Sequence, residues 1–227
     1  MLFGHIGVGL AARPTASKVS LWVLLVSVEL LDILSSIFSL IGIENIEIGT
    51  TWVPWSHGFF ISVVWSATAM GIVGLFYRDR RTGIVIGLLV FSHWVLDFIS
   101  WAAPLPLLFD NAYLVVGLGL GNSVVIEVIV EVGALVGGLA IHIISAKKHN
   151  MVVEDSQLLQ DQVRKNITYM VISWSVAIGS VIALGIWSAS TALTTISLLG
   201  LLYGILCGTE AIGRYWGAKN ALQKLGP

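Results

Sequence analysis

The stretch GIVIGLLVFSHWVLDFISWAA, residues 83–103, is apolar throughout except for its serines and two ionisable side chains, those of His93 and Asp97. An α-helix rises 1.5 Å per residue, so about 20 apolar residues cross the roughly 30 Å of hydrocarbon in a bilayer. The stretch therefore predicts a membrane-spanning helix. A charged group at that depth costs several kcal/mol unless it is paired or coordinated, so the same stretch also predicts a buried polar site.

The composition of the whole chain agrees with a membrane protein. Of its 227 residues, 56% are hydrophobic and only 11% are charged, which lies outside the range of soluble domains. The formal net charge of −1 creates no field that would recruit nucleic acid, so we expect the bilayer, and not a nucleic acid, to be the partner.

Further apolar stretches have the length of a span, and together they predict an all-α fold, a polytopic membrane helix bundle of about six transmembrane helices. The fourth is longer than a span requires and contains Gly117, Gly119 and Gly121 near its start, where we expect irregular backbone. The predicted spans are residues 19–41, 58–76, 83–103, 113–143, 167–189 and 192–213.

The chain begins with an apolar segment, residues 1–12, that is too short to cross. A signal peptide carries its positive charge before the apolar region, whereas Arg13 follows this one, so we expect a short half-inserted helix. The predicted organisation is a metal-site bundle over residues 1–145, a polar cytoplasmic loop over 146–165 and a two-span hairpin over 166–227.

The charges flanking the predicted spans are sorted by side. If the connections alternate, all 12 Lys and Arg lie on one side, and the opposite connections carry only the acids Glu44, Glu47 and Asp110. Positively charged loops stay in the cytoplasm, so both termini are predicted to be cytoplasmic in a multi-pass protein of the plasma (inner) membrane.

Ionisable residues inside the predicted spans gather at one depth. Counted at 1.5 Å per residue from the flanking cytoplasmic charges, Asp32, His93, Asp97 and Glu131 lie about 18 to 24 Å deep, in the outer half of the membrane. His57 reaches that level from the outer end of the second span, and His5 approaches it from below on the short first helix. Glu29 and Glu127 are the other carboxylates of the first four spans.

Imidazoles and carboxylates without Lys or Arg form a set that favours a cation. His93 and Asp97 stand at positions i and i+4, so they share a helix face and can bind one ion together; a simple hydrogen bond between His93 and a carboxylate is the alternative. Glu127 and Glu131 repeat the spacing, and two such carboxylates repel unless one is protonated or a cation lies between them. Metal ligand and general base are both open to this pair.

Several short motifs occur in an order typical of one family. They are Gly-His-Ile-Gly-Val-Gly at residues 4–9, Leu-Leu-Asp-Ile at 30–33, Trp-Ser-His-Gly at 55–58, Ser-His-Trp-Val-Leu-Asp at 92–97 and a Gly-Asn-Ser followed by Glu127. Over about residues 4–131 the chain resembles the bacterial and archaeal inner-membrane metal-dependent hydrolases, the YdjM-like family, which is held to be distantly akin to zinc-dependent phospholipase C and related nucleases.

The resemblance implies a metal site and a reaction. It implies one metal ion held by Asp32, His57, His93 and Asp97, with His5 beside Asp97 as the start of a second metal position, and hydrolysis of a phosphoester. The family usually has Asp-Ile-Asp around Asp32 and a second His before His57, whereas this chain has one Asp and one His. One or two ions are therefore expected.

Three functions remain open at this stage. The first is a metal-dependent hydrolase of a lipid or lipid-linked phosphoester, with zinc as the first choice of divalent metal and manganese or iron as alternatives, and with Glu127 or Glu131 as the base. The second is a divalent-cation or proton-coupled transporter, because buried carboxylates and histidines also form ion pathways. The third is a non-catalytic scaffold with a structural metal. The sequence leaves the oligomeric state open.

Overall fold

Helices make up most of the computed structural model, which describes residues 2–16, 18–46, 51–101, 104–149, 160–162, 164–168, 171–172, 175–176 and 191–225. The chain divides into two compact units, residues 1–145 and 146–227. In the second unit, α9 (Thr191–Leu225) covers the predicted span 192–213, whereas most of the predicted span 167–189 lies outside the described residues.

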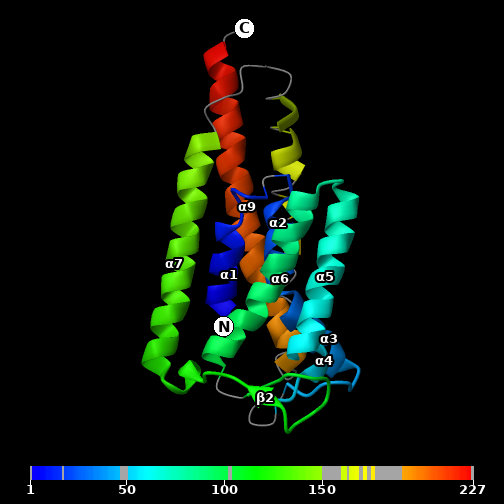
Figure 1. The fold of residues 1–227 in the computed structure, drawn as a ribbon. Helices are drawn as coiled ribbons and strands as arrows, with labels where there is room; N and C mark the ends of the chain where they lie inside the picture. The colour runs from blue at the N-terminus through cyan, green and yellow to red at the C-terminus, as the bar shows by residue number, and fades with distance from the viewer. Residues whose placement is uncertain are drawn as a thin grey trace. The chain divides into compact units, whose positions relative to one another are not determined.

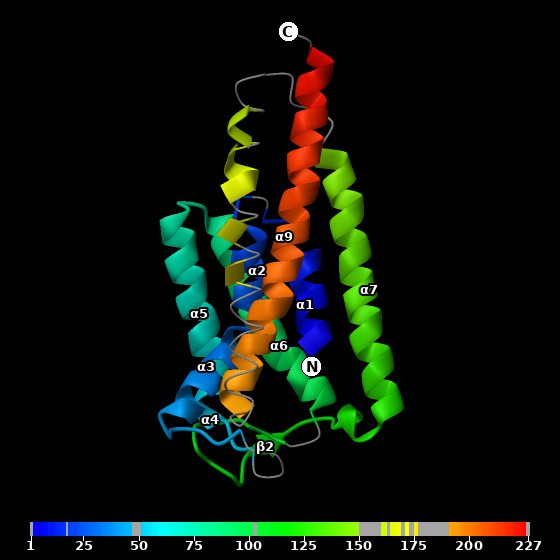
Figure 2. The same ribbon diagram turned by 180° about the vertical axis from the view of Figure 1, so that it is seen from behind.

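The first unit contains every residue that the sequence assigns to the site, and Figures 1 and 2 show its helices from two sides. Its elements in chain order are α1 (Leu2–Ala11), α2 (Leu21–Val28), α3 (Leu30–Leu40), α4 (Pro54–His57), α5 (Phe59–Phe76), α6 (Arg80–Ser100), β1 (Leu105–Pro106), β2 (Val115–Val116), the 3₁₀ turn η1 (Leu120–Asn122) and α7 (Val124–His149).

Three helices among the described residues are long and apolar enough to cross a membrane, namely α5, α6 and α7. The pair α2 and α3 adds a fourth if the two helices, bent by 61° at Glu29, form one broken span. The predicted bundle of six straight spans is thus shown only in part, and its first span, 19–41, is broken and not continuous.

The bend between α2 and α3 has a side chain at its corner. The Nδ1 atom of His93 lies 2.7 Å from the carbonyl oxygen of Val28, the last residue of α2. A side chain that hydrogen-bonds to a helix carbonyl, in place of the backbone N–H four residues later, is a known cause of a sharp kink. His93 therefore belongs to the fold of the first span as well as to the polar site.

Close backbone contact joins α5 to α6. A Cβ atom added at Gly83 would lie 2.9 Å from the Cα atom of Gly74 and 2.7 Å from the carbonyl oxygen of Met70, so glycine is required where the two helices meet. Asp79 caps the start of α6, and its hydrogen bonds with Thr82, followed by Lys18, hold the pKa of its carboxyl below the ordinary value.

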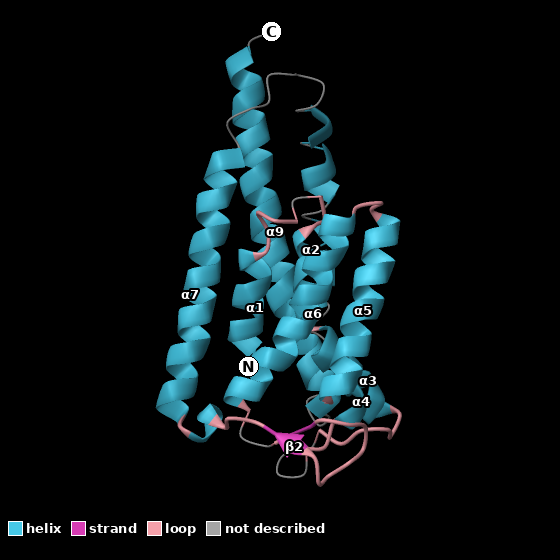
Figure 3. Ribbon diagram, in the orientation of Figure 1, coloured by secondary structure: helices cyan, strands magenta, loops and turns pink. Residues whose placement is uncertain are grey.

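Loops and short elements close one end of the first unit, where Figure 3 shows α3, α4 and the two strands together. Strands β1 and β2 pair antiparallel, Leu105 with Val116 and Pro106 with Val115. The predicted fourth span therefore starts irregularly, as expected, and its helix begins only at Val124. An apolar cluster of Leu31, Val90, Trp94 and Leu105 lies beneath these loops.

Candidate metal centre

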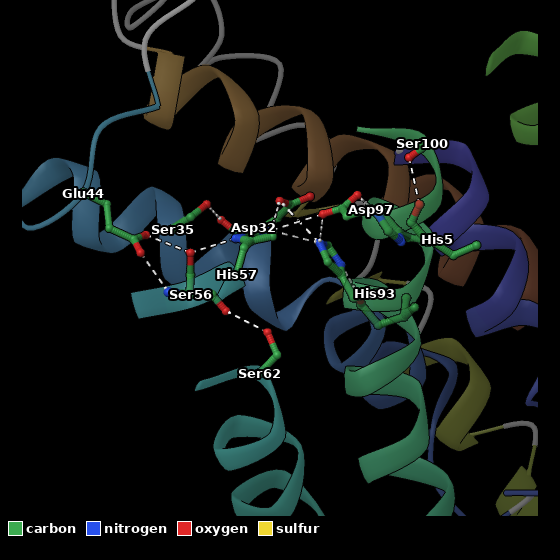
Figure 4. A network of polar contacts seen from close by, with 12 residues as sticks. His5, Asp32, Ser35, Glu44, Ser56, His57, Ser62, His93, Asp97 and Ser100 are labelled. Carbon is green, nitrogen blue, oxygen red and sulfur yellow. Dashed lines mark hydrogen bonds and ion pairs between the residues drawn. The ribbon is translucent and has the colours of Figure 1, made fainter. Parts of the chain in front are cut away.

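Four side chains from three helices point toward one another in the first unit (Figure 4). Asp32 lies in the first turn of α3, His57 ends α4, and His93 and Asp97 lie one turn apart on α6. The α2–α3 break turns α3 out of the axis of α2 directly before Asp32. Residues that are 65 positions apart in the chain are thereby brought to one point.

The two imidazole Nε2 atoms lie close to each other and to one oxygen of each aspartate. The Nε2 atom of His57 lies 3.1 Å from Nε2 of His93, 3.2 Å from Oδ1 of Asp32 and 3.4 Å from Oδ2 of Asp97. The Nε2 atom of His93 lies 3.6 Å from the same Asp32 oxygen and 3.3 Å from the same Asp97 oxygen. All five distances fall in the narrow range from 3.1 to 3.6 Å.

The backbone selects the tautomer of His93. A carbonyl oxygen only accepts hydrogen bonds, so the Nδ1 atom of His93, 2.7 Å from the Val28 oxygen, carries the proton. In a neutral ring the lone pair is then on Nε2, which faces the other three ligand atoms. Metal-ligating histidines characteristically donate their second N–H to such a partner.

A hydrogen-bond chain selects the same tautomer for His57. The hydroxyl of Ser56 lies 2.8 Å from Oε2 of Glu44 and 2.7 Å from Nδ1 of His57. If the hydroxyl donates to the carboxylate, it must accept from the imidazole, so Nδ1 of His57 carries the proton and Nε2 the lone pair. Burial raises the pKa of the Glu44 carboxyl, and the hydrogen bonds from Ser56 oppose that rise.

The resulting donor set fits a divalent metal ion. Two imidazole lone pairs and two carboxylate oxygens repel one another at about 3.3 Å, and one proton can bridge only one pair of them. Tetrahedral zinc, with bonds of about 2.0 to 2.1 Å to nitrogen and oxygen, separates neighbouring ligand atoms by about 3.3 to 3.4 Å. The donor types and the five separations given above are compatible with a divalent ion such as zinc. Two overlapping groups, His57–His93–Asp97 and His5–Asp32–His93, each bring three ligand atoms close enough to hold a metal ion.

No family model matches the chain, and neither a curated protein nor a solved structure matches it. The family resemblance of the sequence motifs therefore stays a prediction. What supports a metal centre is the geometry of the four side chains.

The four residues of the centre differ in how much of their surface is exposed. His57 and His93 are at most 1% exposed and the side chain of Asp97 is 6% exposed, whereas the side chain of Asp32 keeps 30% of its surface accessible. Trp101 covers His57 edge-on, with its ring centroid 5.3 Å from the imidazole. Asp32 is therefore the most accessible of the four side chains.

His5 lies in a second layer beside the four. Its ring stacks on His93 with centroids 3.8 Å apart, and its Nε2 atom lies 3.3 Å from Oδ1 of Asp97, the carboxylate oxygen that faces away from His57. Among the described residues, its Nδ1 atom has no hydrogen-bond partner. Asp97 thus presents one oxygen to the four-atom centre and the other to His5, as the sequence motifs implied.

Glu29 occupies the corner of the broken span. It is fully buried, and neither carboxylate oxygen has a hydrogen-bond partner among the described residues. A buried carboxyl group without partners is costly, so Glu29 is a candidate for a proton or a cation site next to Asp32.

The two glutamates of α7 have different surroundings. The Oε2 atom of Glu131 accepts hydrogen bonds from the backbone N–H groups of Phe3, at 2.7 Å, and Gly4, at 3.2 Å, and so caps the start of α1. Glu127 is half-buried, with its carboxyl carbon 3.7 Å from the Cβ position of Gly121. The structure thus places Glu131 at the helix end that carries His5, and the role of general base stays a prediction for both.

Sequence reasoning missed two groups of the centre, the Glu44–Ser56 pair and the Val28 carbonyl. Ser56 is adjacent to His57 in the sequence, which is a local signal, but nothing in the sequence pairs it with Glu44, 12 residues earlier. The Val28 carbonyl carries no sequence signal, because every residue has one.

Proposed function

We propose that this chain is an integral membrane metal-dependent hydrolase that cleaves a phosphoester of a lipid or lipid-linked substrate. The observation that carries the proposal is the set of five ligand-atom distances between 3.1 and 3.6 Å. The order of the motifs around these residues, similar to that of the YdjM-like family, supports the same assignment.

In this proposal Asp32, His57, His93 and Asp97 hold the ion, zinc first and manganese or iron as alternatives. A bound divalent ion supplies a water of lowered pKa and a positive charge beside the phosphoryl oxygens. His5 marks the place of a second ion, because its Nε2 atom lies 3.3 Å from the outer oxygen of Asp97 and its ligand atoms group with those of Asp32 and His93. Glu127 is the remaining candidate for the group that takes the proton from water, since Glu131 already caps α1.

The location of the centre supports a lipid substrate. Its ligands lie on helices that are apolar enough for a bilayer or at the ends of such helices, near the loops opposite to the basic connections. A phosphoester at that depth is a headgroup whose chains remain in the hydrocarbon, such as a phospholipid or a polyprenyl phosphate. The plasma (inner) membrane, with both termini cytoplasmic, is the proposed location.

A transporter of divalent cations or of a proton-coupled solute is the second candidate. The specific observation in its favour is the 61° break between α2 and α3 with the buried, unpartnered carboxyl of Glu29 at its corner. Broken helices at ion sites are typical of secondary transporters.

The deciding experiment measures bound metal by inductively coupled plasma mass spectrometry in purified protein. Wild type is expected to hold near-stoichiometric zinc, manganese or iron, and a His93→Ala, Asp97→Ala double variant is expected to hold none. A His142→Ala, Asp110→Ala variant removes the same residue types away from the centre and is expected to keep the metal. Wild type that binds no ion, even after incubation with each, would overturn the proposal.

Reconstituted vesicles separate the two candidate functions. Metal-loaded protein is expected to release phosphate or a phosphorylated headgroup from vesicle lipids, and the double variant is not. Metal-dependent ion flux across the vesicle without any hydrolysis would favour the transporter instead.

A further inference from the structure

We propose that Glu44, acting through the hydroxyl of Ser56, is a positioning residue that holds His57 in its metal-binding tautomer. The inference rests on the proposed metal centre and deepens it, because it assigns a function to an outer-loop carboxylate that does not touch the ion.

Glu44 is buried although it belongs to a connection between helices. It is 7% exposed, whereas Asp110 in the following outer connection is exposed. Three donors surround its carboxylate: the backbone N–H groups of Trp55, at 2.7 Å, and Ser56, at 2.8 Å, both bind Oε1, and the Ser56 hydroxyl binds Oε2. The carboxylate is therefore held by hydrogen bonds on both oxygens, which fixes its direction.

The two carboxylate oxygens of Glu44 accept hydrogen bonds from different groups. The bonds to Oε1 hold the backbone of α4, and any acceptor of that shape would serve there. The bond to Oε2 decides where the hydroxyl proton of Ser56 points, because an ionised carboxylate only accepts. The hydroxyl oxygen is then left to accept the proton of His57 Nδ1, at 2.7 Å.

The backbone groups of Ser56 are also hydrogen-bonded, but these bonds leave the direction of its hydroxyl proton to Glu44 and His57. Its backbone oxygen accepts from the hydroxyl of Ser62, at 3.3 Å, and its backbone N–H donates to Glu44. Ser56 is fully buried, which keeps water from offering another partner. The chain from Glu44 through Ser56 to His57 thus leaves the lone pair of His57 Nε2 facing His93, Asp32 and Asp97.

A Glu44→Gln variant reverses this chain without changing its shape. The side-chain NH₂ group takes the place of Oε2 and donates to Ser56, so the serine hydroxyl turns to donate to Nδ1 of His57. The ring proton then moves to Nε2, where it blocks the metal. Ser56→Ala removes the hydroxyl that links Glu44 to His57, and Ser56→Thr keeps a hydroxyl at that place. Ser62→Ala is the matched control, because it deletes an equally buried hydroxyl that donates to the Ser56 carbonyl.

The test combines zinc affinity, measured by competition with a chelator, with the ¹⁵N NMR signals of the His57 ring in metal-free protein. Glu44→Gln and Ser56→Ala are expected to weaken zinc binding by about 10- to 100-fold, as is usual when the partner of a ligating histidine is lost. Ser56→Thr and Ser62→Ala are expected to bind as wild type does. The ¹⁵N spectrum is expected to show Nδ1 protonated in wild type and the proton shifted to Nε2 in Glu44→Gln.

The outcomes separate this proposal from the proposed function. If wild type binds zinc and the Glu44→Gln and Ser56→Ala variants bind it equally well, the positioning role is wrong and the metal centre stands. If wild type binds no metal, the proposed function fails, and the ¹⁵N tautomer shift between wild type and Glu44→Gln still decides the positioning role. Should Ser56→Ala not fold, Glu44→Gln and Ser56→Thr carry the comparison alone.

Discussion

At the scale of single residues, Glu131 shows how a carboxylate at membrane depth can have a structural task. The first N–H groups of a helix have no partner within the helix, and in a bilayer no water reaches them. Glu131 accepts two of these groups, those of Phe3 and Gly4, and its negative charge also faces the positive end of the helix dipole. Since Gly4 precedes His5, this cap helps to set the position of the His5 ring.

Substitution of Glu131 separates the cap from a catalytic role. Glu131→Ala is expected to lower the free energy of unfolding by about 1 kcal/mol, the usual cost of losing an N-terminal cap, whereas Glu131→Gln keeps an accepting oxygen and most of that stability. The measurements are thermal unfolding in detergent and lipid phosphoester hydrolysis.

Glu127→Gln is the matched comparison on the same helix. It is expected to unfold as wild type does and to lose hydrolysis. The reverse result, with hydrolysis abolished by Glu131→Gln and retained by Glu127→Gln, would assign the base to Glu131.

At the scale of elements, α1 meets α7 through backbone contact. A Cβ atom at Gly138 would lie 1.9 Å from the carbonyl oxygen of Gly7, and a Cβ atom at Gly7 would lie 2.2 Å from the carbonyl oxygen of Ala134. Figures 1 and 2 both show α1 between α7 and α6. Gly133 and Gly137 form a small-xxx-small pair in the sequence, but a Cβ atom at either would have no atom of the described residues outside α7 within 4 Å. The contact face of α7 is instead that of Ala134 and Gly138.

A methyl group added on each face of α7 tests this contact. Gly138→Ala is expected to destabilise the first unit by about 1 to 3 kcal/mol, because the added carbon overpacks a backbone contact that cannot yield. Gly137→Ala places the same group where no described residue outside α7 lies within 4 Å and is expected to be neutral or to stabilise the helix by up to about 1 kcal/mol. Equal unfolding temperatures for the two variants would contradict the close contact between α1 and α7.

At the scale of the whole molecule, the first unit sorts its charges between two ends. The connection after α1 meets the α5–α6 turn, where Lys18 pairs with Asp79 at 3.3 Å, and Arg78, Arg80 and Arg81 lie in or beside that turn. The other end carries the acids Glu44 and Asp110 in the loops around α4 and the β1–β2 hairpin. By the positive-inside rule, we predict that the basic end is cytoplasmic.

Cysteine labelling in intact cells tests the orientation. The single natural cysteine, Cys207, is first replaced by serine, and cysteine is then introduced at Thr15 on the basic end or at Tyr113 on the acidic end. Both sites are exposed, and neither change alters the number of Lys and Arg. A membrane-impermeant maleimide is expected to label the Tyr113→Cys variant in intact cells and the Thr15→Cys variant only after permeabilisation. The opposite pattern would reverse the assignment of the two sides.

The sequence by itself determined the class of the protein and the members of its polar site. Long apolar stretches predict membrane helices because the bilayer admits almost no other backbone, and ionisable residues stand out within them because they are rare and costly there. Counting residues from the flanking charges placed Asp32, His93, Asp97 and Glu131 at one depth. The structure brings the first three together with His57, whereas Glu131 caps α1. Depth along a helix axis depends only on position in the chain, which is why the sequence was sufficient for it.

Only the tertiary structure decided which side-chain and backbone groups of different helices and loops contact one another. At the break beside Glu29, the Val28 carbonyl is contacted by the His93 ring, and the hydroxyl next to His57 donates to the loop carboxylate of Glu44. The same holds for Glu131, which caps a helix more than 120 residues away. Each of these is a contact between backbone or side-chain atoms distant in the chain, and hydropathy and spacing carry no information about which face of a helix meets which partner.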